Sequence, residues 1–263
     1  MIINTNNTCY LSCVLQCLIH TKSMQRYLDA VPHHDNLFAK HFVELCKSVR
    51  RHIKTDPTQF YNLIRDKYKY FQNNDHHDAH EAFSVLLDRL TDAFPRIPHT
   101  MFRSSSRTAR SVWSAHRDYH IIDEIFKIMH QVDYLCTRCK HRSTAYETDY
   151  VYYGPEESET LADYRCDRCG KSGTTTRSQR VIHYPQTLVR VHKTPVIPDP
   201  SLVLDRKYRL FAWINHTKFD DSKGHYRAVI RNDTKWILVD DDHTTELTKD
   251  LTAYMSFYEI IDF

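Results

Sequence analysis

The chain has 263 residues, of which 41% are hydrophobic, and a formal net charge of +3 at pH 7. This length fits one large domain or two lobes with a sizeable core. The weak net charge indicates neither a nucleic acid nor an anionic membrane as a partner. No apolar run reaches the length of a membrane span, and the N-terminus lacks the charged-then-apolar pattern of a secretory signal.

Apolar residues recur at helical spacing in the first ninety residues. We expect helices over residues 11–18, 38–53 and 79–94. Pro57 separates the second of these from the third, and Pro95 ends the third.

Residues 99–118 lose this periodicity and are rich in serine and arginine. Such a composition is typical of a mobile linker or loop. We interpret the basic stretch 102–117 as a solvated surface, because basic composition alone specifies no partner. The alternative, a nucleic-acid-binding arm, would require strongly salt-dependent binding of DNA or RNA.

The pattern changes to strands from about residue 120. Residues 208–214 alternate clearly between apolar and polar, residues 226–230 and 254–258 alternate less clearly, and residues 236–239 are a candidate buried strand. Helices followed by strands indicate the α+β class.

Two Cys-x-x-Cys pairs, Cys136/Cys139 and Cys166/Cys169, lie 26 residues apart. Four thiolates on two short turns are typical of a tetrahedral structural zinc site. Because four cysteines leave no open coordination position, we expect one structural Zn²⁺ per chain without a catalytic role. His141 follows the first pair but is not needed as a ligand.

Three further cysteines, Cys9, Cys13 and Cys17, are spaced four residues apart and would share one face of a helix. Neighbouring free thiols persist best in a reducing compartment. The sequence therefore predicts a protein of the cytoplasm or nucleus.

Cys9 follows Thr8, a residue type that often caps helices, and so would occupy the first helical turn. The free N–H groups and positive end of a helix favour thiolate over thiol there. A nucleophilic cysteine also needs a base. The alternative is that Cys9 is a small buried core residue, which is the commoner role of cysteines near helix starts.

His225 is the histidine whose surroundings best suit that base. It lies near the start of a predicted strand, and the next predicted strand ends at Asp240 and Asp241. Two adjacent antiparallel strands would set His225 against Asp240, the geometry that orients and charge-stabilises an imidazole. A structural histidine beside an acidic turn remains the alternative at this point.

Taken together, these segments resemble the ubiquitin-specific proteases. Residues 4–18, which contain Asn7-Thr8-Cys9-Tyr10, closely resemble the cysteine box of that family. The match spans almost the whole chain in the family's order. Residues 77–88 look like the family's next helix, and residues 183–189 resemble the strand that precedes the histidine box. The histidine box itself is matched by residues 208–216, 224–226, 236–241 and 254–258.

The resemblance implies a papain-like cysteine protease with a right-hand architecture. Residues 1–98 would form a helical thumb, residues 99–118 a linker or loop, residues 119–180 the zinc-bearing fingers, and residues 181–263 a β palm. The active site would lie between thumb and palm.

The same resemblance implies roles for individual residues. Cys9 would be the nucleophile, His225 the base, Asp240 the residue that orients it, and Asn4 a donor that helps to stabilise the oxyanion. His216 matches a histidine of the box that is not catalytic.

Two acidic residues receive roles on the same ground. Asp78 matches a position that meets the basic C-terminal tail of ubiquitin in relatives, and Asp241 would be auxiliary to Asp240. One departure from the family is Asn6, which stands where a glycine is common; asparagine tolerates the left-handed conformation that glycine would supply.

The implied activity is thiol-dependent hydrolysis of the isopeptide bond after the C-terminal glycine of ubiquitin. The implied partners are ubiquitin and ubiquitinated proteins, and another ubiquitin-like modifier remains an alternative substrate. A non-catalytic ubiquitin-binding module is a second alternative. Both a compact virus-encoded enzyme and a trimmed catalytic domain fit the chain length.

Overall fold

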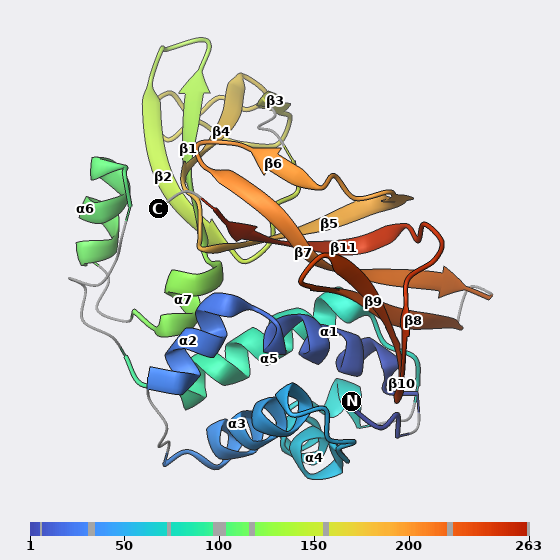
Figure 1. Ribbon diagram of the computed structural model, residues 1–263. Coiled ribbons are helices and arrows are strands. Elements are labelled where there is room, and N and C mark those ends of the chain that lie inside the picture. The colour runs from blue at the N-terminus through green and yellow to red at the C-terminus, as the bar shows by residue number, and fades with distance from the viewer. Residues whose placement is uncertain are drawn as a thin grey trace.

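The computed structural model describes residues 1–5, 7–30, 35–72, 75–96, 104–115, 119–154, 158–219 and 223–261. A layer of helices lies against one face of a twisted β-sheet, and a second sheet extends away from that layer (Figure 1). The described helices are α1 (Cys9–Ile19), α2 (Lys22–Ala30), α3 (Leu37–Arg50), α4 (Thr58–Lys67), the 3₁₀ turn η1 (Lys69–Phe71), α5 (Ala79–Ala93), α6 (Arg107–Ala115) and α7 (Ile121–Phe126).

The two sheets are antiparallel throughout. The smaller has the strand order β2-β1-β4-β3, and the larger has the order β10-β9-β8-β7-β11-β5, with β6 paired to β7. The strands are β1 (Ile128–Cys136), β2 (Arg142–Asp149), β3 (Ser158–Leu161), β4 (Thr175–His183), β5 (Thr187–Val196), β6 (Ser201–Val203), β7 (Lys207–Lys218), β8 (Gly224–Asn232), β9 (Lys235–Asp240), β10 (His243–Glu246) and β11 (Ala253–Ile260).

Helix α1 occupies the middle of the molecule, between the other helices and the larger sheet (Figure 1). All of its residues are buried, including the polar Ser12 and Gln16. The Ser12 hydroxyl is satisfied by the hydroxyl of Tyr61, 2.8 Å away, as a buried polar group requires. The central position of α1 makes its first residue, Cys9, a fixed point of the fold.

The helical layer and the larger sheet share one hydrophobic core. Phe83 of α5 lies at their junction, with its ring 6.0 Å from that of Phe126 and 5.9 Å from that of Phe257. Such edge-to-face aromatic pairs add to the burial of apolar surface. Phe83 therefore ties α5 to both α7 and β11.

The helices expected over residues 11–18, 38–53 and 79–94 are confirmed as α1, α3 and α5. The second ends earlier than expected, at Arg50, and Ile53 is exposed beyond it. Within the described ranges, no helix is both long enough and apolar enough to cross a membrane.

The structure differs from the expected loop at residues 107–115, which form α6. Ala109 and Trp113 of this helix are buried, and the Trp113 ring packs 4.8 Å from that of Tyr119. The apolar spacing does not predict this helix, because the helix is short and only Ala109 and Trp113 form its buried face. The rest of the basic stretch falls partly on residues 101–103 and 116–118, outside the described residues.

The expected strands at residues 208–214, 226–230, 236–239 and 254–258 are confirmed. The change from helix to strand comes later than residue 120, because α7 intervenes with a capping box between His120 and Asp123. Strand β9 is less buried than predicted: only Val239 of residues 236–239 is buried, since β9 is next to the last strand at one edge of its sheet.

Candidate active site and candidate metal centre

Cys9 is the first residue of α1 and is 2% exposed. Thr8 is the N-cap residue, as predicted, and its carbonyl accepts hydrogen bonds from the N–H groups of Leu11 and Ser12. No side chain of the described residues caps this helix end. The positive end of α1 therefore remains directed at Cys9.

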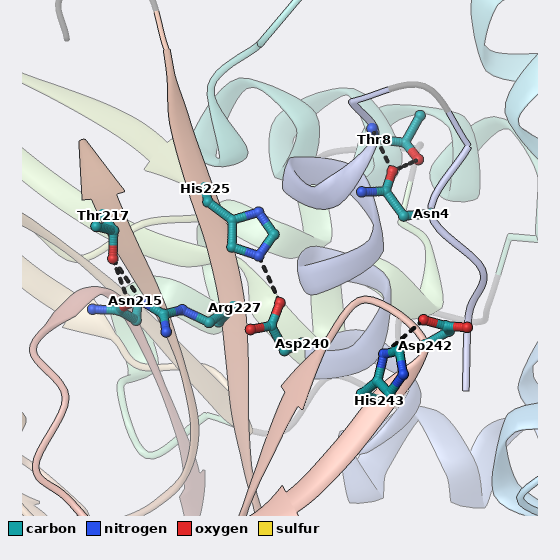
Figure 2. Close-up of polar contacts among 9 residues, drawn as sticks. All are labelled: Asn4, Thr8, Asn215, Thr217, His225, Arg227, Asp240, Asp242 and His243. Atoms are coloured by element: carbon teal, nitrogen blue, oxygen red, sulfur yellow. Dashed lines mark hydrogen bonds and ion pairs between the residues drawn. The ribbon is translucent and has the colours of Figure 1, made fainter. Parts of the chain in front are cut away.

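The Thr8 hydroxyl is engaged by the preceding loop. It donates to Oδ1 of Asn4 at 3.0 Å, and the Thr8 N–H donates to the same oxygen at 3.0 Å. These two bonds leave the amide nitrogen of Asn4 as its free end, and in Figure 2 that nitrogen points toward the side of α1 on which His225 lies. Asn7 is left-handed, with φ 58°; the expectation for Asn6 falls on a residue outside the described ones.

His225 and Asp240 meet as the strand pattern predicts. Strands β8 and β9 pair antiparallel, and Nε2 of His225 donates to Oδ1 of Asp240 at 2.6 Å (Figure 2). The Cys9 side chain lies close enough to the same ring to act on its pKa.

The surroundings of His225 stabilise its charged form. Contact with the Cys9 side chain is the largest cause, Asp240 adds to it, and burial opposes both, so that the pKa of His225 is raised to about 9. A histidine with this pKa is mainly an imidazolium at neutral pH. The arrangement can hold a thiolate and an imidazolium side by side.

Asp241 follows Asp240 in a left-handed conformation, with φ 52°. One carboxylate oxygen of Asp241, one carboxylate oxygen of Asp240 and one ring nitrogen of His225 all lie within 4.8 Å of one another. Oδ1 of Asp241 is buried and has no hydrogen-bond partner in the described part of the chain. The structure thus places Asp241 beside the pair, with an acceptor unused.

Asp78 caps α5 and also joins that helix to the larger sheet. Its Oδ1 accepts from the N–H groups of His80 at 2.8 Å and Glu81 at 3.2 Å. Its Oδ2 accepts from the hydroxyls of Tyr254 at 2.7 Å and Tyr226 at 3.3 Å. A carboxylate has about four acceptor positions, so these four donors account for all of them.

A cavity of about 490 Å³ opens beside this carboxylate, lined in part by Asp78, His216, Tyr226 and Tyr254. The His216 ring stacks on that of Tyr226 with centroids 4.0 Å apart, and its pKa is lowered by burial. Gly224 also lines the cavity, and a Cβ there would lie 2.3 Å from Nε2 of His216. His216 therefore forms part of the wall of this cavity.

The four predicted zinc cysteines come together at the far end of the smaller sheet. Their sulfur atoms all lie within 4.8 Å of one another. The Cys136 and Cys169 sulfurs are 3.8 Å apart, and those of Cys139 and Cys166 are 3.7 Å apart. A tetrahedral site with Zn–S bonds of about 2.3 Å needs sulfurs about 3.8 Å apart, so these residues fit the metal.

The two Cys-x-x-Cys turns have matching backbones. Lys140 and Gly170, which follow the second cysteine of each pair, are left-handed with φ 60° and 67°. Their N–H groups donate to the carbonyls of Cys136 and Cys166 at 2.9 and 2.8 Å. His141 is not in the group of donor atoms. Backbone donation from Cys139 is the main cause that lowers the pKa of Cys136 to about 6.

Sequence reasoning missed the two tyrosines that bind Asp78. Both lie in strands that it located, at residues 226 and 254, but nothing in the alternation pattern shows that their hydroxyls meet an acid from α5. It also missed that the Thr8 hydroxyl holds Asn4. An asparagine four residues before a helix-capping threonine was the available signal.

With the fold and these clusters described, comparison with known proteins defines the class. The family model for ubiquitin carboxyl-terminal hydrolase matches residues 2–258, and the chain belongs to this family. The resemblance to ubiquitin-specific proteases in the sequence is thereby confirmed.

Similar proteins include ubiquitin carboxyl-terminal hydrolase 23 of Arabidopsis thaliana, which is 22% identical over 97% of this chain and 35% of its own length. Ubiquitin carboxyl-terminal hydrolase 17-like protein B of Mus musculus is 22% identical over 97% of this chain and 62% of its own length. The chain therefore spans less than two thirds of these relatives.

Among solved structures, the chain is similar to the yeast SAGA DUB module, with a TM-score of 0.74 and 18% identity over 99% of this chain and 68% of the other. It is also similar to the SAGA Ubp8/Sgf11/Sus1/Sgf73 DUB module bound to ubiquitin aldehyde, with a TM-score of 0.74 and 16% identity over 99% of this chain and 69% of the other. The α+β fold is therefore that of the ubiquitin-specific proteases.

Proposed function

We propose that this chain is a thiol-dependent deubiquitinase that hydrolyses the isopeptide bond after the C-terminal glycine of ubiquitin. One observation carries the proposal: Cys9, at the positive end of α1, lies beside His225, and Nε2 of His225 is hydrogen-bonded to Asp240. Membership of the ubiquitin carboxyl-terminal hydrolase family supports it. Ubiquitin and ubiquitinated proteins would be the partners.

In this mechanism the Cys9 thiolate attacks the carbonyl carbon of the terminal glycine. His225, protonated at neutral pH because its pKa is raised to about 9, gives its proton to the departing lysine amine. The bond from carbon to nitrogen breaks, and an acyl-enzyme remains on Cys9. Water, deprotonated by the now neutral His225, then hydrolyses the thioester and restores the thiol.

Asn4 is the proposed oxyanion donor. Its Oδ1 is held by two bonds from Thr8, which fix the amide plane and leave the nitrogen to donate. A donor fixed before the reaction stabilises the developing negative charge without reorganising. Replacing Asn4 by alanine should lower kcat by about 10²–10³-fold.

Asp78 and Asp241 keep their predicted roles as proposals. Asp78 would meet the basic tail of ubiquitin by its charge, since its four acceptor positions are already occupied. Asp241 would assist Asp240 with its unused oxygen.

A ubiquitin probe with a C-terminal electrophile tests the proposal. Wild-type protein should form a covalent adduct, and Cys9→Ala should form none. Cys13→Ala, one helical turn further along the same helix, is the matched control and should still be labelled. Labelling that persists in Cys9→Ala would sink the assignment, and binding without cleavage of a fluorogenic ubiquitin substrate would favour a non-catalytic module.

Another ubiquitin-like modifier is the second candidate substrate. The four hydrogen bonds that Asp78 already accepts favour this alternative, because the basic tail of ubiquitin would find no free hydrogen-bond acceptor on that carboxylate. The same electrophile built on different modifiers separates the two candidates by relative labelling rate.

We further propose that Cys136, Cys139, Cys166 and Cys169 hold one structural Zn²⁺. Four thiolates would close its coordination sphere, so the metal would stabilise the smaller sheet and supply no catalytic group. Metal analysis should find about one zinc per chain. Cys136→Ser and Cys166→Ser should lose it, whereas Cys46→Ala, in α3, should keep it; unchanged zinc in the first two variants would remove the site.

We propose the cytoplasm or nucleus as the compartment, because none of the eight cysteines forms a disulfide. The predicted division into thumb, linker, fingers and palm is likewise a proposal. Two observations bear on its boundaries: α7 packs into the core of the helical layer, and β4, which begins in the fingers, runs past residue 180.

A further inference from the structure

A second cavity, of about 570 Å³, lies at the end of the larger sheet away from His225. Helix α2, helix α7, the start of β7 and the end of β11 enclose it. Four cationic side chains line it: Lys22 and Arg26 from α2, and Arg206 and Arg209 at the start of β7. The proposed catalytic mechanism uses none of them.

Two carboxylates among the described residues line the cavity, and both already have hydrogen-bond partners within the protein. Glu259 is 11% exposed and accepts from Lys22 at 3.0 Å and from Arg209 at 2.8 Å. Glu124 is buried and accepts from Gln186 at 3.1 Å. Among the described residues that line the cavity, four cations stand against two carboxylates, so this part of the lining carries an excess of positive charge.

Helix α2 adds to this excess. Its first residues, Lys22 and Ser23, line the cavity, so the positive end of the helix is directed there. The first turn of α2 contains no acidic residue to offset that charge. Helix N-termini favour anions through their free N–H groups and the aligned peptide dipoles.

His183 also lines this cavity, and its surroundings shift its pKa. Burial, and after it the charge of Arg206, lowers the pKa of His183 to about 4. His183 is therefore a neutral ring at physiological pH and adds a polar surface without further charge.

We propose that this cavity binds a phosphate-bearing anion, either a small free polyphosphate or a phosphorylated side chain of a partner. Guanidinium groups match phosphate oxygens through paired N–H donors, which an ammonium group does not offer. The volume is within the range of sites for small ligands, about 300–1,000 Å³. Cys9, His225 and Asp240 do not line this cavity, so the proposal does not depend on the catalytic assignment.

Calorimetric titration of the zinc-loaded full chain with inorganic tripolyphosphate tests it. We expect saturable binding of one equivalent that weakens as salt is added. Arg206→Gln and Arg26→Gln should each weaken binding by about tenfold or more, since each removes a charged donor. Arg142→Gln, on β2 and away from the cavity, makes the same change of charge and should leave binding unaltered.

Two further arms complete the test. A phosphopeptide and its unphosphorylated twin show whether a phosphorylated side chain can be the source, because only the former should bind. Arg206→Lys keeps the charge but loses the paired donors, and it should bind tripolyphosphate more weakly than wild type even where Arg206→Gln fails to fold. No saturable binding of either phosphate probe, or an equal loss in Arg142→Gln, would overturn the proposal whatever the enzyme does to ubiquitin.

Discussion

At the scale of single residues, the chemistry proposed for Cys9 depends on partners from distant parts of the chain. The helix start that favours its thiolate is local, whereas His225 and Asp240 come from two strands near the other end of the sequence. Contact with Cys9 is the largest cause that raises the pKa of His225, and Asp240 supplies a further part. The proposed ion pair is therefore a property of the three residues together.

The pH dependence of Asp240→Asn follows from this arrangement. His225 is charged below its pKa of about 9 and loses its proton above it, so activity should fall on the alkaline side near that pH. Because Asp240 raises the pKa, its removal should move this fall to lower pH and reduce kcat/KM by about 10²-fold. Initial rates on a fluorogenic ubiquitin substrate between pH 6 and about 10 measure both effects.

Asp242→Asn is the matched control, because Asp242 lies in the same turn but pairs with His243 (Figure 2) and with Lys54. These exposed pairs contribute little, so the profile should keep its alkaline limb. An unchanged limb in Asp240→Asn would contradict the role proposed for that residue.

At the scale of elements, the N-terminus of α5 is a junction between the helical layer and the larger sheet. Asp78 caps the helix and at the same time accepts from Tyr226 of β8 and Tyr254 of β11. Hydrogen bonds to a charged group contribute about 1.5–3 kcal/mol each. The junction fixes the wall of the 490 Å³ cavity that also contains His216.

Tyr254→Phe tests the strength of this junction. The change removes the 2.7 Å bond to Asp78 and leaves the ring in place, so we expect a loss of about 1.5–3 kcal/mol in the free energy of unfolding. Tyr226→Phe, whose bond is longer at 3.3 Å, should cost less. Urea unfolding of both variants measures the difference.

A double-mutant cycle adds a functional readout. It combines Asp78→Asn in this chain with ubiquitin in which the basic residues of the C-terminal tail are replaced by alanine. If Asp78 acts mainly through the two tyrosines, the effects on KM should add. Strong coupling between the two changes would instead support direct recognition of the basic tail.

At the scale of the whole molecule, the core shared by the helices and the larger sheet keeps the proposed nucleophile Cys9 beside its proposed base His225. Helix α1 lies between α5 and β8, and Phe83 ties α5 to α7 and β11. Close-packed interiors transmit small shifts, so a cavity at Phe83 should disturb the active site without touching it.

Phe83→Ala should lower the free energy of unfolding by about 3–5 kcal/mol. It should also slow labelling by the ubiquitin probe, because the helical layer would relax relative to the sheet. Leu37→Ala, at a position 58% exposed, should change stability by less than about 0.5 kcal/mol. Thermal unfolding and labelling rates of the two variants provide the comparison, and equal stabilities would contradict the packing role of Phe83.

Some of this could be predicted from the sequence because its signals are local or come in fixed order. The helical spacing of α1, α3 and α5, the alternation of β7, β8 and β11, and the two Cys-x-x-Cys pairs are each visible within short windows. The order of the boxes predicted the family. Helix α6 escaped notice, since nine residues with a narrow apolar face, rich in serine and arginine, do not differ enough from a loop.

Cys9 could be identified from its motif, but its partners could be placed only by assuming that two strands pair. By itself the sequence predicted which residues would carry the proposed chemistry, because nucleophile, base and metal ligands must come from a few residue types in recognisable motifs. Only the tertiary structure decided what each one meets: two hydroxyls from distant strands donate to Asp78, and four cations line the same cavity as two carboxylates that already accept hydrogen bonds. Such contacts join segments far apart in the chain, and only folding, which offsets the entropy of closing those long loops, brings them together.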